Sequence, residues 1–197
     1  MEAGDILYLP PGVSHHGVAK GESLTFSIGY RAPDYNSLAL DFAGLLAEEK
    51  EMEFYTDPDL TLQTNPGELD KKSVEKIKAK MLEKIERVDF NDWFATYITQ
   101  PKWNISVEER EEPASLDEFK KLLSEHKILK RDPSTSALFY NNGRDLFMNG
   151  EKIEVPSGCE GLAVKVSNQR TIELSDFDDE LQEVFLLKLY NRGHLYF

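Results

Sequence analysis

The residues with the clearest capacity for chemistry are two adjacent histidines, His15 and His16, which come just after a Pro-Pro-Gly turn at positions 10–12. A neutral imidazole is the commonest metal ligand in proteins. Neighbouring side chains on an extended segment point to opposite faces, so we expect one of the two histidines, and not both, to enter a site. The pair is therefore a candidate metal ligand just after a turn, although a single histidine is more often structural.

Two expected strands position this pair. Residues 5–9 are mostly apolar and end at consecutive prolines, which cannot donate to a β-ladder. Residues 23–30 alternate, with bulky apolar side chains on one face and small or hydroxyl-bearing residues on the other. This pattern favours the wall of a small barrel that holds a polar ligand.

The runs Gly4–Gly17 and Phe26–Pro33 together resemble the second half of a JmjC-type cupin barrel. The closest resemblance is to the bacterial ribosomal oxygenases, which are Fe(II)- and 2-oxoglutarate-dependent hydroxylases of an arginine in a ribosomal protein. In that family the histidine after Pro-Pro-Gly is one ligand of a 2-His-1-carboxylate iron site. The resemblance therefore implies that His15 binds the metal and that Thr25 and Ser27 line the 2-oxoglutarate pocket.

The other iron ligands of that family form a His-x-Asp pair upstream of this motif. None of the four histidines here stands in a His-x-Asp or His-x-Glu pattern. We therefore expect the chain to be the carboxyl-terminal part of such an oxygenase, and to be inactive and without bound Fe(II) or 2-oxoglutarate by itself. The alternative, which stays open, is a non-catalytic, acidic module for dimerisation and protein interaction.

The amino-acid composition limits which classes of partner the chain can bind. Its 197 residues carry a formal net charge of −13, and acidic residues outnumber basic ones in each of its three expected segments. Binding of nucleic acid depends largely on Lys and Arg, so we expect no direct contact with DNA or RNA. A basic ribosomal protein would be attracted to this acidic chain. The sequence has one cysteine and no run long enough to span a membrane, which favours a cytoplasmic protein.

We predict an α+β protein of three parts. Residues 1–33 would be carboxyl-terminal strands of the cupin/JmjC barrel. Residues 34–102 would form helices capped near Asp34, at 73–87 and at 89–99, the last with a broad aromatic face. The resemblance implies that this helical region makes a homodimer, although intramolecular packing would give the same pattern.

Residues 103–197 resemble the winged-helix-like domain of the same family. After an acidic linker at 108–113, Ser115 and Glu118 predict a capping box, and Asn149-Gly150 predicts a two-residue hairpin. Three short strands are expected at 128–131, 137–140 and 146–148, a fourth at 151–155, and helices at 159–168 and 178–190.

The remaining polar groups favour structural roles. We interpret Asp57 and Asp59 as turn residues, the acidic run 176–180 as a helix beginning, and His126 and His194 as surface groups. Cys159 stands at an expected helix start, where a thiolate would be favoured, but no histidine lies nearby in sequence to make it catalytic.

Overall fold

The computed structural model describes residues 2, 4–10, 12–29, 32–48, 53–58, 61–101, 107–177 and 179–197. Several sequence-based expectations lie outside these residues: the strand end at Tyr30, the turn residue Asp59, the boundary at 102/103 and a helix start at Asp178. The chain divides into two compact units, Met1–Asp41 and Phe42–Phe197. No helix among the described residues is long and apolar enough to cross a membrane.

The amino-terminal unit differs from expectation in its secondary structure. The described residues between 4 and 29 form extended chain with turns and no strand, where strands at 5–9 and 23–30 were predicted. A strand is held by hydrogen bonds to a neighbour, and a two-stranded ribbon is at best marginally stable in water. The alternating pattern is present, but no ladder is formed that would use it.

Three helices follow. Helix α1 spans Tyr35–Ala47, and the Asp34 carboxylate accepts hydrogen bonds from the Asn36 and Ser37 amides, both at 3.0 Å. Helix α2 spans Lys71–Arg87 and is capped by Asp70. Helix α3 spans Phe90–Thr99 and is capped by Asp89. The predicted helices thus form within two residues of their expected bounds.

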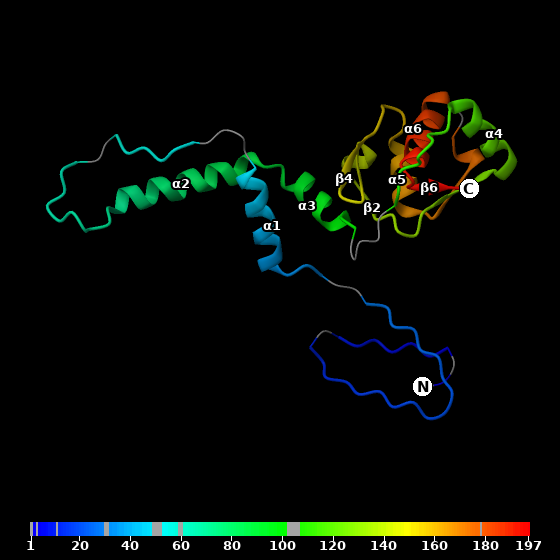
Figure 1. The fold of residues 1–197 in the computed structure, drawn as a ribbon, viewed down its shortest axis with the longest axis horizontal. Coiled ribbons are helices and arrows are strands. Elements are labelled where there is room, and N and C mark those ends of the chain that lie inside the picture. The colour runs from blue at the N-terminus through cyan, green and yellow to red at the C-terminus, as the bar shows by residue number, and fades with distance from the viewer. Residues whose placement is uncertain are drawn as a thin grey trace. The chain divides into compact units, whose positions relative to one another are not determined.

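The carboxyl-terminal domain contains three more helices and two three-stranded antiparallel sheets (Figure 1). The helices are α4 (Leu116–His126), α5 (Glu160–Asn168) and α6 (Glu180–Asn191). One sheet has the order β5-β1-β6, with β1 at Ile128–Arg131, β5 at Thr171–Glu173 and β6 at Leu195–Tyr196. The other has the order β2-β3-β4, with β2 at Ala137–Tyr140, β3 at Asp145–Met148 and β4 at Glu151–Glu154. Two 3₁₀ turns, η1 (Asn141–Gly143) and η2 (Leu174–Asp176), connect elements.

Local sequence accounts for much of this domain. The Ser115–Glu118 capping box forms at the start of α4, as predicted. Asn149 and Gly150 adopt φ of 49° and 86° and join β3 to β4 with Met148 opposite Glu151. Strands β5 and β6 were not predicted, because two- and three-residue strands are too short to show an alternating pattern.

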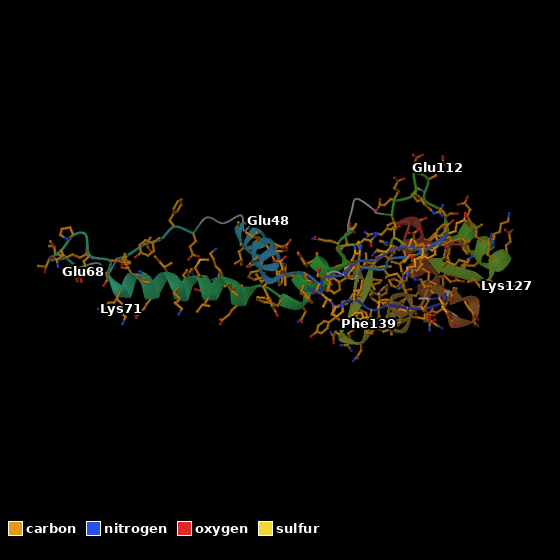
Figure 2. All side chains as sticks on the ribbon, turned by 90° about the horizontal axis from the view of Figure 1, so that it is seen from below. Glu48, Glu68, Lys71, Glu112, Lys127 and Phe139 are labelled. Atoms are coloured by element: carbon orange, nitrogen blue, oxygen red, sulfur yellow. The ribbon has the colours of Figure 1, made fainter. Side chains whose placement is uncertain are left out.

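The core of the molecule lies in this domain. Helices α4, α5 and α6 each bury an apolar face against the sheets, and the largest fully buried side chains include Phe119, Phe147 and Phe185. Figure 2 shows the dense side-chain packing of this domain, with Phe139 labelled in β2. The α+β class and the winged-helix-like arrangement are as predicted.

Helix α3 packs directly on the β2-β3-β4 sheet. Thr99 is buried, and its hydroxyl accepts a hydrogen bond from the Gly150 amide at 3.1 Å. The Lys152 ammonium of β4 lies 2.8 Å from the Asp92 carboxylate of α3. The buried residues of α3 are Ala95 and Thr99, so the helix meets the sheet with its small side chains.

The expected acidic linker at 108–113 is docked onto the end of α6. The Arg110 amide donates to the Asn191 carbonyl at 2.9 Å, and the Arg110 guanidinium lies 3.8 Å from the centroid of the Tyr190 ring. The Asn191 side chain completes the contact by bonding both the amide and the carbonyl of Ala114, at 2.9 and 3.1 Å. Composition alone does not predict this contact, because its partners are some eighty residues apart in sequence.

Candidate functional site

The turn before the histidine pair forms as the Pro-Pro-Gly sequence requires. The Val13 amide donates to the Pro10 carbonyl at 3.3 Å, and Gly12 adopts a φ of 77°, which residues with a side chain rarely do. His15 follows directly, and its Nδ1 lies 3.1 Å from the Val13 carbonyl oxygen. If that nitrogen carries the proton, Nε2 is left as the electron-pair donor that a metal would use.

The three residues implied in metal and co-substrate binding are solvent-exposed in this unit. His15, Thr25 and Ser27 are exposed, as is His16. The apolar side chains beside them are exposed too: Leu24, Phe26 and Ile28 retain 80% or more of their accessible surface. The structure therefore leaves both faces of residues 23–29 uncovered, and it does not test the assignment of Thr25 and Ser27 to a pocket.

The described residues do not fit an iron centre by themselves. They contain no group of three or more His, Cys, Asp or Glu side chains placed to hold a metal ion. A facial iron site needs two imidazoles and a carboxylate, and one exposed imidazole does not hold the metal against water. His15 can supply one ligand of such a centre, and the described part of the chain does not supply the other two.

Two further side chains that could do chemistry, Cys159 and His194, are buried in the carboxyl-terminal domain. Cys159 is fully buried, and burial raises the pKa of its thiol, which opposes the thiolate that a helix start would favour. His194, expected at the surface, is only 5% exposed. It lies in the turn between α6 and β6, where its Nδ1 is 3.3 Å from the Thr135 hydroxyl. Its position near the chain end suggested exposure, but this end of the chain pairs with β1 through β6 and is part of the folded domain.

The Asp57 carboxylate fastens the loop before α2 to the helix. It accepts hydrogen bonds from the Tyr55 and Ser73 hydroxyls, both at 3.0 Å, and lies 3.6 Å from the Lys76 ammonium. The hydrogen bonds from Tyr55 and Ser73 lower the pKa of Asp57. This turn residue therefore also sets where residues 53–58 lie along α2, which sequence spacing alone did not reveal.

Aromatic side chains join α1 to α3. The Phe42 ring lies 4.7 Å from the Phe90 ring and 4.8 Å from the Trp93 ring, measured between centroids. Phe90 and Phe94 nevertheless remain 48% and 41% exposed. The aromatic face predicted for this helix thus serves partly as intramolecular packing and partly as free surface.

Comparisons with known proteins match both ends of the chain. A family model described as ROXA-like winged helix matches residues 78–196, and a JmjC domain model matches residues 1–38. The ribosomal protein uL16 3-hydroxylase of Escherichia coli is 31% identical over 205 residues, which cover 100% of this chain and 53% of that protein. A probable ribosomal oxygenase of Haemophilus influenzae is 26% identical, covering 98% of this chain and 48% of that one.

Solved structures that match this chain are also of a ribosomal oxygenase. The ribosomal oxygenase YcfD from Escherichia coli matches with a TM-score of 0.71 at 27% identity, covering 86% of this chain and 48% of that one. A structure of YcfD in complex with cobalt and 2-oxoglutarate matches with a TM-score of 0.70 at 27% identity, covering 86% and 47%. The chain thus spans about half the length of the curated relatives that it matches.

Proposed function

The chain belongs to the family of ROXA-like winged-helix proteins, and we propose that it is the carboxyl-terminal part of a ribosomal oxygenase. The match of residues 1–38 to a JmjC domain carries this proposal, because that domain is where the metal and the co-substrate of such an oxygenase would bind. The activity would be Fe(II)- and 2-oxoglutarate-dependent hydroxylation, on an arginine of a ribosomal protein such as uL16. Three parts would share the work: residues 1–33 in the barrel, 34–102 in a dimerisation region and 103–197 in the winged-helix-like domain.

His15 would supply one imidazole to the metal from the end of the Pro-Pro-Gly turn. The turn would fix the backbone position from which the His15 side chain projects. The contact between Nδ1 and the Val13 carbonyl oxygen would orient the ring. Thr25 and Ser27 would line the 2-oxoglutarate pocket with their hydroxyl groups. When bound, iron and 2-oxoglutarate would supply the oxidising chemistry. The complete protein would bind and orient the reactants and exclude water from them.

The apolar surface of residues 23–29 supports a place inside a larger barrel. Phe26 is 83% exposed and Leu24 equally so, in a stretch whose alternating pattern is typical of a half-buried strand. Neighbouring strands of a JmjC barrel would cover this surface and bring His15 toward its fellow ligands. The net charge of −13 suits a basic protein substrate.

Fusion of the chain behind the first half of the Escherichia coli relative provides a test. We expect the fusion protein to retain Fe(II) and to convert 2-oxoglutarate to succinate in the presence of a uL16 peptide, and the present chain alone to do neither. His15→Ala in the fusion protein should reduce turnover at least about a hundredfold, because loss of a group that only supports a ligand already costs about 10–100-fold and His15 would be a ligand itself.

His16→Ala is the matched control, since the neighbouring side chain points away from the site and its loss should leave turnover within about threefold. Equal losses in the two variants would contradict the assignment of His15. A folded fusion protein that binds no iron would contradict the oxygenase proposal. In that case an acidic interaction module would be the better description of the chain.

A further inference from the structure

The outer face of the β5-β1-β6 sheet is open to solvent and carries an aromatic ring beside a cation. The residues that point inward from the three strands are buried in the core: Leu129, Ile172 and Leu195. Their neighbours point outward, and the strand register places Lys130 of β1 between Thr171 of β5 and Tyr196 of β6. Tyr196 is 37% exposed, and the Lys130 ammonium lies 5.8 Å from the centroid of its ring. The ring and the ammonium group are therefore accessible to the same ligand.

Basic side chains without an acidic partner gather at this sheet. Residues 103–197 contain 12 Lys or Arg against 18 Asp or Glu. Away from the sheet, several of these cations are paired with carboxylates: Lys120, Lys152, Lys165 and Arg192. Lys127, Lys130 and Arg170 are exposed, and no ion pair joins them to a carboxylate of the described residues. Figure 2 shows Lys127 at the periphery of the domain, in the turn between α4 and β1.

The balance of charge on the sheet is the reverse of that in the whole domain. Residues 127–131, 170–173 and 195–196 together carry four Lys or Arg against one acidic residue, Glu173. The carboxylate of Glu173 accepts a hydrogen bond from the Asp176 amide in the capping box of η2. Burial, and after it the charge of Arg170, lower the pKa of the Arg131 guanidinium, so these two cations lie within electrostatic reach of each other. The sheet is thus a basic patch on an acidic domain.

The chemistry of this patch favours one class of anion. The charge of the whole chain disfavours nucleic acid, but exposed charges act over only about 8 Å at physiological ionic strength. Proteins that bind single-stranded nucleic acid combine cations for the phosphates with aromatic rings on which bases stack. An acidic peptide would use the cations and leave the Tyr196 ring without a role. A duplex would not use the ring either, because its bases are already stacked on one another.

We propose that the outer face of the β5-β1-β6 sheet binds single-stranded nucleic acid. One base stacks on the Tyr196 ring, and the Lys130 ammonium turns from the ring to the adjacent phosphate. Arg170 and Lys127 meet phosphates on either side. The oxygenase activity proposed above is not required for this binding, because all four residues lie in the carboxyl-terminal domain.

Fluorescence anisotropy of a labelled oligouridine of about twelve nucleotides, titrated with the full chain, tests the aromatic contact. Tyr196→Ala should raise the Kd at least about fivefold, because the stacked base loses its platform. Tyr196→Phe keeps the ring and should bind within about twofold of the wild type. Equal affinity of the Tyr196→Ala and Tyr196→Phe variants would overturn the stacking contact.

The dependence on salt tests the cations independently of Tyr196. Each phosphate contact of a single strand contributes about 0.7 to the slope of log Kd against log salt concentration, so three contacts predict a slope of about 2. Lys130→Ala should lower this slope by about 0.7. Lys121→Ala removes the same charge from an exposed position on α4 and should leave the slope unchanged. Equal slopes for the Lys130→Ala and Lys121→Ala variants would contradict the placement of phosphate at Lys130.

Two competing probes decide the class of partner. A duplex of the same length and an oligoglutamate peptide of the same charge should each bind at least about fivefold more weakly than oligouridine. A duplex that binds equally well would show that no base stacks on the sheet. Equal binding of oligoglutamate would reduce the face to a general anion surface. Absence of oligouridine binding at low salt would overturn the proposal, whatever the outcome of the oxygenase assays.

Discussion

At the scale of the residue, His194 shows how far an environment can depart from what sequence position suggests. Burial lowers the pKa of His194 to about 4, and the positive charge of Arg192 acts in the same direction, while Asp132 and Glu109 oppose it. The ring lies against the Thr135 hydroxyl. Its backbone joins α6 to β1, donating to Leu189 and accepting from Asp132. The folded domain therefore holds this imidazole neutral.

This burial predicts acid sensitivity. In the unfolded chain His194 binds a proton near its ordinary pKa of 6.5, whereas in the folded chain it resists until about 4. Stability is thus fully present above pH 6.5 and falls as the pH drops toward 4. Chemical denaturation should show the wild type losing roughly 2 kcal/mol more than His194→Gln between pH 7 and pH 5.

His126→Gln is the matched control, because it makes the same substitution at a histidine that is exposed and not buried. If His194→Gln and the wild type lose stability equally on acidification, the imidazole does not stay neutral in the folded chain.

Residue roles were predicted unevenly from sequence. Helix caps such as Ser115 and Asp34 depend on neighbours within three residues, and the structure confirms them. The environments of His194 and Arg110 depend on residues far away in sequence, and no local pattern reports such contacts. The role of His15 was implied by a motif, and it stays a prediction because its side chain is exposed in this unit.

At the scale of the element, α3 is joined to the carboxyl-terminal domain at the hairpin of β3 and β4. Gly150 has a φ of 86°, and a Cβ added there would lie 2.9 Å from Cγ of Gln100. Its amide donates to Thr99, and Lys152 bridges to Asp92. The hairpin turn was predicted from its sequence, but its use as the seat for a helix was not.

Gly150→Ala should therefore destabilise the chain by about 1–3 kcal/mol, since the added methyl group meets both a strained backbone and the Gln100 side chain. Gly161→Ala is the matched control: Gly161 lies in α5 with nothing within 4 Å of an added Cβ. It should stabilise the helix by up to about 1 kcal/mol. Thermal unfolding of the two variants gives the comparison, and equal effects would contradict a specific role for the α3 contact.

Element types were largely predictable, and pairing was not. The six α-helices in the described part of the chain lie near their expected bounds because capping residues and helical spacing are local signals. Strands β1 to β4 carried similar signals, whereas β5 and β6 are too short to do so. The alternating residues 23–29 carried the signal without forming a strand, because a sheet depends on partners that local sequence does not specify.

At the scale of the whole molecule, the chain combines an uncovered JmjC segment with a well-packed winged-helix-like domain. The core lies almost entirely between residues 114 and 197, whereas the apolar side chains of residues 4–29 are exposed. This contrast explains why the fold class and the family could be predicted from the sequence, whereas a complete metal site could not be built from the described residues. The carboxyl-terminal domain contains its own packing partners, whereas the described residues contain no group of side chains that could complete the proposed metal site with His15.

We have proposed that this chain is part of an oxygenase that adds one oxygen atom to a ribosomal protein and depends on His15. The most direct measurement is the intact mass of the uL16 protein from ribosomes of the source organism, before and after deletion of the gene that encodes this sequence. We predict that deletion lowers this mass by one oxygen atom. Restoring the gene, or its His16→Ala form, should recover the mass, and the His15→Ala form should not. An unchanged uL16 mass after deletion, or full recovery with His15→Ala, would contradict the account.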